Sequence, residues 1–171
     1  KEQLAIARER AETTKAPEKL DFRFQDYRMI KGKFDSIISV EMMEAVGHRY
    51  LGEFFESIDR LLKPDGVAVL QVIAFPDYEY KDYLKRQDWI QRHIFPGSHL
   101  PSLNAMVTAV AEKTKLMVES VENIGPHYAL TLKAWHKIFN QKLSEIKALG
   151  YDNHFIRTWQ FYFASCEAEF R

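Results

Sequence analysis

Two glutamates follow the apolar run FDSIISV, and their types and spacing could support chemistry. Glu41 and Glu44 stand in the segment VEMMEAVGHRYLGEFF, directly after that run. A pair of carboxylates at one edge could act in acid–base catalysis or hold a reactive ion. The plainer interpretation of either acid alone is a carboxylate at the start of the next helix, where the helix dipole favours negative charge.

The elements around these acids are typical of a βαβ unit. The β-branched run at 34–40 predicts a parallel strand covered on both faces. Apolar residues at helical spacing predict a helix over 48–62, the segment KPDG ends it, and VAVLQVIA predicts a strand at 67–74. Open α/β sheets bind ligands past the carboxyl ends of their strands. We therefore expect one crevice to hold Glu41, Glu44, Gln71 and Ile73, together with Asp26 and Tyr27 at the end of the preceding predicted strand.

The rest of the chain also alternates helix and strand. The period-two pattern of LDFRFQDY predicts a strand at 20–27, and KLMVESVENI predicts another at 115–124. The aromatic and charged stretch from 75 to 102 is too long for an ordinary connection. With the helix that follows, it forms a substrate-side insertion at 76–114. Helical patterns cover four further segments: 1–14, 103–114, 127–149 and 154–170.

Length and composition narrow the class of protein. The chain has 171 residues, enough for one domain with its own core. Its 24 basic and 24 acidic residues balance, so net charge implies no attraction to nucleic acid. A single cysteine, Cys166, excludes an internal disulfide framework and favours a cytoplasmic protein. No apolar stretch approaches the roughly 20 residues of a membrane helix, so membrane contact would be peripheral. No residue cluster has metal-ligand spacing, and we predict no metal.

Five segments in collinear order resemble the cyclopropane fatty acid synthase family: FDSIISVEMMEAVG, GVAVLQVIA, HIFPGSHLPS, ENIGPHYALTLKAW and FIRTWQFYFASCEAEFR. The resemblance covers nearly the whole chain. It implies an α/β, Rossmann-like methyltransferase fold with a helical lipid-binding insertion. It also implies a cyclopropane-fatty-acyl-phospholipid synthase, which transfers a methylene from S-adenosylmethionine to a cis double bond through a carbocation, with bicarbonate as base. The implied partners are unsaturated phospholipid acyl chains at the membrane surface, and the resemblance leaves room for a homodimer.

The resemblance also assigns catalytic roles. Glu44 matches the acid that helps to hold bicarbonate, Ile73 contributes backbone to the same site, and Tyr128 in PHYALTL supplies its tyrosine. Gln71 stands where many family members have a histidine. Its amide can still donate a hydrogen bond to an anion, but it cannot titrate near neutral pH. Cys166 matches a cysteine treated as an active-site residue, although a lone cysteine is commonly a buried apolar side chain.

For the cofactor, the resemblance implies contacts from Gln3, from Asp26 and Tyr27 on the adenine side, and from Val40 at a strand end. The glycine-rich loop and first strand of the family should precede residue 1. We therefore expect 1–171 to be one partial methyltransferase domain, a C-terminal fragment of a longer enzyme. We also expect this segment alone to bind S-adenosylmethionine weakly and to be inactive.

Two other functions stay open. Plant alkaloid N-methyltransferases, which act on small amines, share an EMFEH-like turn, but they would prefer histidines at Ala45 and Gln71. A non-catalytic domain that binds lipid or a partner is the other alternative. The insertion also carries a basic face that could meet phospholipid headgroups, although an ordinary solvated helix explains it as well: Lys81, Lys85, Arg86 and Arg92.

Overall fold

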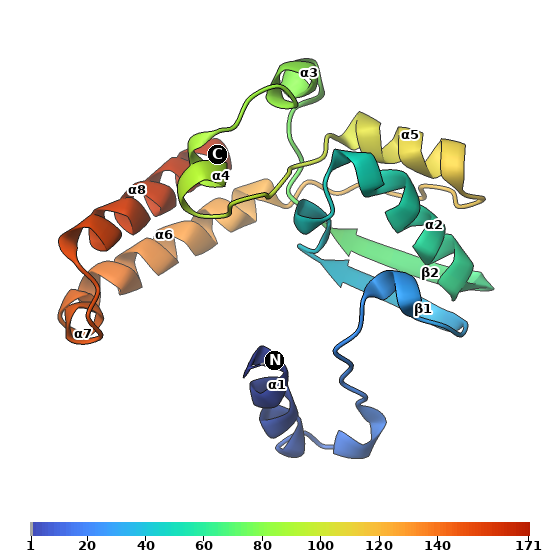
Figure 1. Cartoon of the computed structure of the whole chain (residues 1–171), viewed down its shortest axis with the longest axis horizontal. Helices are drawn as coiled ribbons and strands as arrows, with labels where there is room; N and C mark the ends of the chain where they lie inside the picture. The colour runs from blue at the N-terminus through green and yellow to red at the C-terminus, as the bar shows by residue number, and fades with distance from the viewer. Residues whose placement is uncertain (1) are drawn as a thin grey trace.

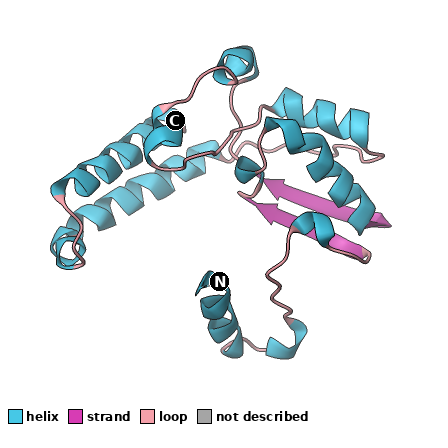
Figure 2. Cartoon of the chain, viewed as in Figure 1, coloured by secondary structure: helices cyan, strands magenta, loops and turns pink. Residues whose placement is uncertain are grey.

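A two-stranded parallel sheet positions the expected crevice. The computed structural model describes residues 2–171. Strands β1 (Phe34–Val40) and β2 (Leu62–Gln71) pair in parallel, with Val40 opposite Gln71, and helix α2 (Leu51–Leu61) connects them. Figure 1 shows both arrowheads ending at the same edge, and Figure 2 shows how few residues are in strands. The βαβ unit predicted from the sequence is therefore present.

The main core lies between one face of this sheet and two helices, α2 and α5 (Leu103–Lys113). Its buried side chains are apolar residues at helical spacing, supplied mostly by α2: Met43, Leu51, Phe54, Phe55, Ile58, Leu62 and Val110. The opposite face of the sheet is open, because the side chains of Ile38 and Val69 are 74% and 58% exposed. The prediction that β1 is covered on both faces is therefore wrong at Ile38.

The start of β2 also differs from the prediction. The strand begins at Leu62, directly after α2, and it ends at Gln71, whereas the sequence placed it at 67–74. The segment KPDG lies inside β2 as an irregularity in its register against β1. A Cβ atom at Gly66 would lie 2.8 Å from Cδ2 of Leu62 and 3.1 Å from the carbonyl oxygen of Asp35. This close approach explains a glycine within the irregular part of the strand.

The two other predicted strands do not form. Residues 20–26 have no regular structure and lead into a 3-10 turn at Tyr27–Met29, and 115–124 is likewise irregular. A period-two pattern makes a strand only when a neighbouring strand completes its hydrogen bonds. No described residue pairs with either segment, and Phe24 and Met117 are 74% and 85% exposed. Helix α1 (Glu2–Glu12) does form, and Nη2 of Arg8 donates to the carbonyl of Phe22 at 3.0 Å.

The second half of the chain is helical. The predicted helix at 127–149 is divided at Lys142. Helix α6 (Gly125–Gln141) packs beside α8 (Asn153–Glu169) around a small second core of Leu132, Phe163 and Cys166 (Figure 1). Within residues 2–171, no helix is both long and apolar enough to cross a bilayer. The remaining helices have these bounds: α3 Tyr80–Tyr83, α4 Trp89–His93 and α7 Leu143–Ala148.

Candidate active site at the carboxyl ends of the strands

Glu44 lies in a short 3-10 turn, Met43–Ala45, that follows β1. The side chain of Met43 is 1% exposed and anchors the turn in the main core. Oε1 of Glu44 accepts a hydrogen bond of 2.7 Å from the backbone N–H of Ile73. Oε2 is buried and has no hydrogen-bond partner among the described residues. Because a buried carboxylate oxygen is costly to leave unpaired, this position suits a ligand that donates a hydrogen bond.

Glu41 joins the ends of the two strands. Its backbone N–H donates to the carbonyl of Gln71 at 2.9 Å, and Nε2 of Gln71 donates to Oε1 of Glu41 at 3.1 Å. Among residues 2–171, Glu41 is the only non-glycine residue with a positive φ, at 49°. The 3-10 turn that follows has Met42 as its N-cap and no side-chain cap hydrogen bond, and α2 begins only at Leu51. The plainer interpretation, a carboxylate at the start of a helix, therefore does not describe Glu41. The hydrogen bond to Glu41 also uses one of the two amide hydrogens of Gln71.

Tyr128 stands in the first turn of α6, and its ring packs edge-on against Phe170 at 4.9 Å between centroids. Burial raises the pKa of the Tyr128 phenol, and the charges of Glu41, Cys166 and Glu44 act in the same direction. The phenol therefore stays protonated at neutral pH and can donate a hydrogen bond. The start of α6 thus lies within electrostatic reach of both acids at the strand ends.

Cys166 lies in the second core, in the last turns of α8, and it is 6% exposed. Burial raises the pKa of its thiol to about 11. A nucleophilic cysteine needs a lowered pKa, so this environment favours the thiol over the reactive thiolate. The geometry supports the plainer interpretation of Cys166, a buried apolar side chain.

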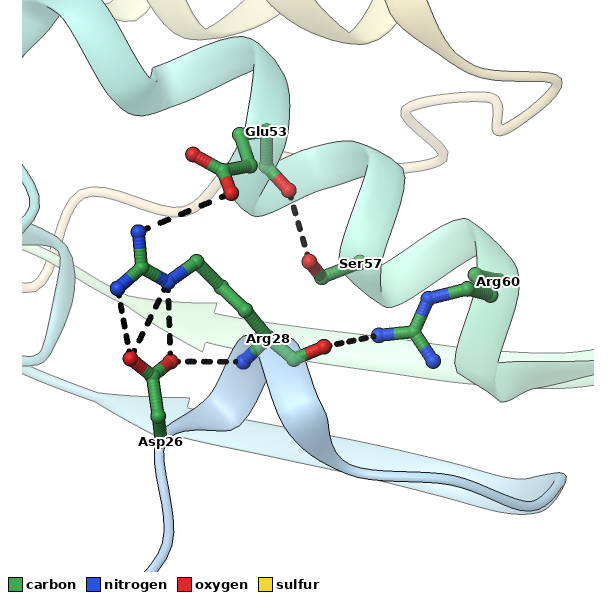
Figure 3. A network of polar contacts seen from close by, with 5 residues as sticks. All are labelled: Asp26, Arg28, Glu53, Ser57 and Arg60. Atoms are coloured by element: carbon green, nitrogen blue, oxygen red, sulfur yellow. Dashed lines mark hydrogen bonds and ion pairs between the residues drawn. The ribbon is translucent and has the colours of Figure 1, made fainter.

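The residues expected to bind the cofactor are not brought together. Asp26 caps the turn at Tyr27–Met29, and its carboxylate pairs with the Arg28 guanidinium at 2.7 Å (Figure 3). The hydrogen bonds from Arg28 hold the pKa of the Asp26 carboxyl at about 2. The ring of Tyr27 packs edge-on against Phe54 of α2, with 5.7 Å between centroids. Asp26 is thus held by Arg28 of its own turn, whereas the Tyr27 ring packs on α2.

The other two cofactor residues lie elsewhere. Val40 ends β1 on the open face of the sheet and is 59% exposed. Gln3 lies on α1, where it lines a groove of about 490 Å³ together with residues of α1 and of the segment at 20–22. Figure 1 shows α1 apart from the carboxyl ends of both strands. The four residues predicted to bind the cofactor therefore do not line one enclosed pocket among the described residues.

The structure adds a polar cluster that sequence analysis missed. The hydroxyl of Tyr80 lies 2.9 Å from Nδ1 of His48 and 2.8 Å from Nε2 of His99. The backbone N–H of His99 donates to the carbonyl of Glu44 at 2.8 Å, so this cluster fixes the insertion against the Glu44 turn. Burial, followed by the charge of His48, lowers the pKa of His99. In the sequence, the only indication of this polar cluster is the motif HIFPGSHLPS, which contains His99.

No group of three or more His, Cys, Asp or Glu side chains within residues 2–171 could hold a metal ion. The side chains described at this edge are two carboxylates, an amide and a phenol. These groups can hold a small hydrogen-bonding ligand between Glu44 and Tyr128, at the position where α/β folds bind their ligands.

A family model described as mycolic acid cyclopropane synthetase matches residues 1–171. The chain belongs to this family. It is 36% identical to the tuberculostearic acid methyltransferase UfaA1 of Mycobacterium tuberculosis over 99% of this chain and 40% of that protein. It is 35% identical to the cyclopropane-fatty-acyl-phospholipid synthase of Escherichia coli over 99% of this chain and 42% of that protein. The chain thus spans less than half the length of these relatives.

A solved structure confirms the fold. The mycolic acid cyclopropane synthase CmaA1, complexed with SAH and CTAB, superposes with a TM-score of 0.82 at 23% identity. The match covers 100% of this chain and 62% of that structure. The expected partial, Rossmann-like α/β methyltransferase fold is therefore confirmed, as is the family. The relatives are S-adenosylmethionine-dependent methyltransferases.

Proposed function

We propose that this chain is the acid-bearing part of a cyclopropane-fatty-acyl-phospholipid synthase. Such an enzyme transfers a methylene from S-adenosylmethionine to the cis double bond of an unsaturated phospholipid acyl chain. The observation that carries the proposal is the Glu44 carboxylate, with Oε1 held by the N–H of Ile73 and Oε2 buried and unpaired. Bicarbonate bound there would supply the base that removes a proton after the transfer.

The donor set of this edge fits bicarbonate. Oε2 of Glu44 can accept a hydrogen bond from the O–H of the ion, while the N–H of Ile73 keeps the carboxylate oriented. The protonated phenol of Tyr128 and the second amide hydrogen of Gln71 can donate to oxygens of the ion. Gln71 keeps its charge state at every working pH, so Gln71 would position the ion without exchanging protons.

We further propose that the enzyme is cytoplasmic and meets the membrane peripherally, because its acyl substrates lie in a bilayer. Exposed apolar side chains on the insertion support this placement, since Tyr78 is 85% exposed and Phe95 is 49% exposed. A helical insertion that presents aromatic tips can contact the interface without a spanning segment. A homodimer of the enzyme is likewise a proposal.

The test uses the native protein that contains this segment, with vesicles of cis-unsaturated phosphatidylethanolamine and S-adenosylmethionine labelled in its methyl group. We expect the label in the phospholipid, in an acyl chain that gains one CH₂ and contains a ring. If the acyl chain instead gains a methyl branch and no ring, the enzyme is a lipid methyltransferase, the activity in the name of the relative from Mycobacterium tuberculosis. A labelled small amine would favour an N-methyltransferase, and no transfer at all would favour a non-catalytic domain. Either of these last two results overturns the proposal.

A further inference from the structure

The loop between α4 and α5 contacts both sides of the hydrogen bond between Glu44 and Ile73. The backbone N–H of His99 in this loop donates to the carbonyl of Glu44 at 2.8 Å. Two residues after Ile73, the backbone N–H of Phe75 donates to the carbonyl of Pro101 at 2.9 Å. The acid and the N–H that orients it are therefore held against the same short piece of backbone. The direction of the unpaired Oε2 of Glu44 depends on where this loop lies.

The two tyrosines at the ends of α3 hold this loop by their hydroxyls. The Tyr83 hydroxyl accepts the backbone N–H of Leu100 at 3.0 Å. The Tyr80 hydroxyl lies 2.8 Å from Nε2 of His99, the residue whose backbone contacts Glu44. The side chain of Tyr80 is 7% exposed, so packing fixes its ring and gives its hydroxyl a defined position. Tyr80 is thus connected to the Glu44 turn through one intermediate residue.

The Tyr80 hydroxyl is placed to hold the His99 ring in one orientation. A phenol has one O–H to donate and can also accept. Nδ1 of His48 lies 2.9 Å from the same hydroxyl, so one ring nitrogen can donate to it while the other accepts from it. Burial lowers the pKa of the half-buried His99, which keeps its ring neutral at neutral pH. Without the hydroxyl, Nε2 of His99 would lose its partner, and a half-buried polar group without a partner is costly.

We infer that Tyr80 is a positioning residue for the proposed reaction: its hydroxyl, acting through His99, keeps the Glu44 turn where Oε2 can hold the ion. The inference deepens the proposed function and rests on it. The hydrogen bonds of the Tyr80 hydroxyl go to the two histidines, so its effect on Glu44 has to pass through His99. A displacement of about 1 Å at a group that orients a reactant can cost about 100-fold in rate. The alternative is that Tyr80 only stabilises the fold.

Two pairs of variants separate these roles. Tyr80→Phe removes the hydroxyl and keeps the buried ring. Tyr151→Phe is its matched control, because the Tyr151 ring is 49% exposed and stacks on Phe155 of α8. In the second pair, His99→Gln places an amide where Nε2 faces the Tyr80 hydroxyl, whereas His99→Ala leaves that hydroxyl without a partner on this side. All variants are made in the native protein that contains this segment.

The first measurement is hydrogen exchange of the His99 amide, which does not depend on the reaction. The protein is labelled with ¹⁵N-histidine, and the His99 signal is the one missing from His99→Gln. This amide exchanges when its bond to Glu44 opens locally. We expect exchange at least about tenfold faster in Tyr80→Phe, the scale of one lost hydrogen bond, and no change in Tyr151→Phe. The amide of His136 in α6 should keep its rate in both variants.

The second measurement is turnover, followed by the label transfer to lipid described above. In Tyr80→Phe we expect kcat to fall about 10- to 100-fold with unchanged KM for S-adenosylmethionine, because the acid is displaced and the cofactor contacts are not. Tyr151→Phe should match the parent. His99→Gln should keep more turnover than His99→Ala, because its amide restores the contact with Tyr80.

Unchanged exchange of the His99 amide in Tyr80→Phe would overturn the inference, and so would faster exchange with normal turnover. Equal acceleration at His99 and His136 would show general destabilisation and would overturn it as well. Equal turnover in His99→Gln and His99→Ala would contradict a role for the contact with Tyr80. If the parent transfers no label to lipid, the proposed function fails, and the exchange result alone then decides whether Tyr80 holds the Glu44 turn.

Discussion

The backbone N–H of Ile73 and the carboxylate of Glu44 form a 2.7 Å hydrogen bond that links the segment after β2 to the turn after β1. The bond occupies Oε1 and leaves Oε2 buried without a partner among the described residues. A polar contact of this kind fixes the direction of the unpaired oxygen. The pair therefore defines where a hydrogen-bond donor can be held at the strand edge.

Replacing Glu44 by glutamine should abolish most turnover in the native protein. The amide oxygen can still accept from Ile73, but an NH₂ group then occupies the buried position and cannot accept a donor ligand. We expect a loss of at least about 100-fold in kcat with unchanged affinity for S-adenosylmethionine. Added bicarbonate should restore activity to depleted parent enzyme and not to the variant.

The matched comparison is Glu41→Gln, which should lose far less turnover because Glu41 is exposed and the new amide oxygen can still accept the hydrogen bond from Gln71. Normal turnover by Glu44→Gln, or an enzyme indifferent to bicarbonate depletion, would show that this turn is only a structural feature. Single-turnover kinetics separate the chemical step from product release in this comparison.

Gly66→Ala should destabilise the chain. The new methyl group would meet Cδ2 of Leu62 at 2.8 Å and two backbone oxygens at 3.1 Å, and backbone atoms move less readily than a leucine tip. Overpacking of this kind costs about 1 to 3 kcal/mol. Urea unfolding should show the loss. Gly150→Ala is the control, because its new methyl group would meet no atom within 4 Å and its strain would come from the positive φ alone. Equal stability of Gly66→Ala and the parent would mean that β2 can shift at its irregularity.

Local patterns predicted the elements whose packing partners lie close in sequence. The apolar spacing at 48–62 predicted α2 because its stripe faces a sheet that the same unit supplies. The patterns at 20–27 and 115–124 failed because strands need hydrogen-bond partners, which a single segment does not reveal. Phe24 alternates correctly in sequence and is nevertheless 74% exposed.

The candidate site could be predicted only in part. The sequence predicts Glu44, Gln71 and Ile73 at one edge because the ends of parallel strands meet there. The hydrogen bond between Gln71 and Glu41 could not be predicted, because it occurs at a residue with a positive φ. The contact of His99 with the Glu44 turn could not be predicted either, because it depends on how the insertion folds back.

Acid should weaken the contribution of Asp26 to stability. The hydrogen bonds from Arg28 lower the pKa of the Asp26 carboxyl from 3.8 to about 2 in the folded chain. Its stabilising contribution is therefore complete above a pH of about 4 and is lost as the pH falls through about 2. Asp26→Asn keeps a capping side chain but removes the charge. The unfolding curves of parent and variant should converge as the pH falls through this range, and a constant difference would contradict the assignment.

Cys166 should behave as a buried thiol. With a pKa of about 11, roughly one thiol in a thousand is ionised at a pH of about 8, so iodoacetamide should react slowly until the chain is unfolded. Because the folded pKa is raised from 9.0, the contribution to stability is lost as the pH rises from about 9 to about 11. Cys166→Ala should keep turnover within about tenfold. Rapid alkylation of the folded chain, or loss of turnover comparable to Glu44→Gln, would restore a catalytic role.

The insertion should contact membranes mainly through apolar side chains. Its basic residues are partly neutralised within the insertion, since Lys85 pairs with Asp82 at 2.9 Å and Arg86 with Glu79 at 3.5 Å. Two of the four residues of the basic face expected from the sequence are therefore paired, and Lys81 and Arg92 form no ion pair among the described residues. Tyr78 and Phe95, by contrast, remain exposed.

Replacing both Tyr78 and Phe95 by serine should reduce sedimentation with phosphatidylethanolamine and phosphatidylglycerol vesicles by about tenfold or more, because each buried aromatic contributes about 1.5 kcal/mol or more. Added salt should change binding little, since contacts between apolar groups are not screened. Met117→Ser is the control, because Met117 is 85% exposed but lies outside the insertion. Binding that falls steeply with salt, or falls equally in the control, would show that the insertion is not the membrane-facing surface.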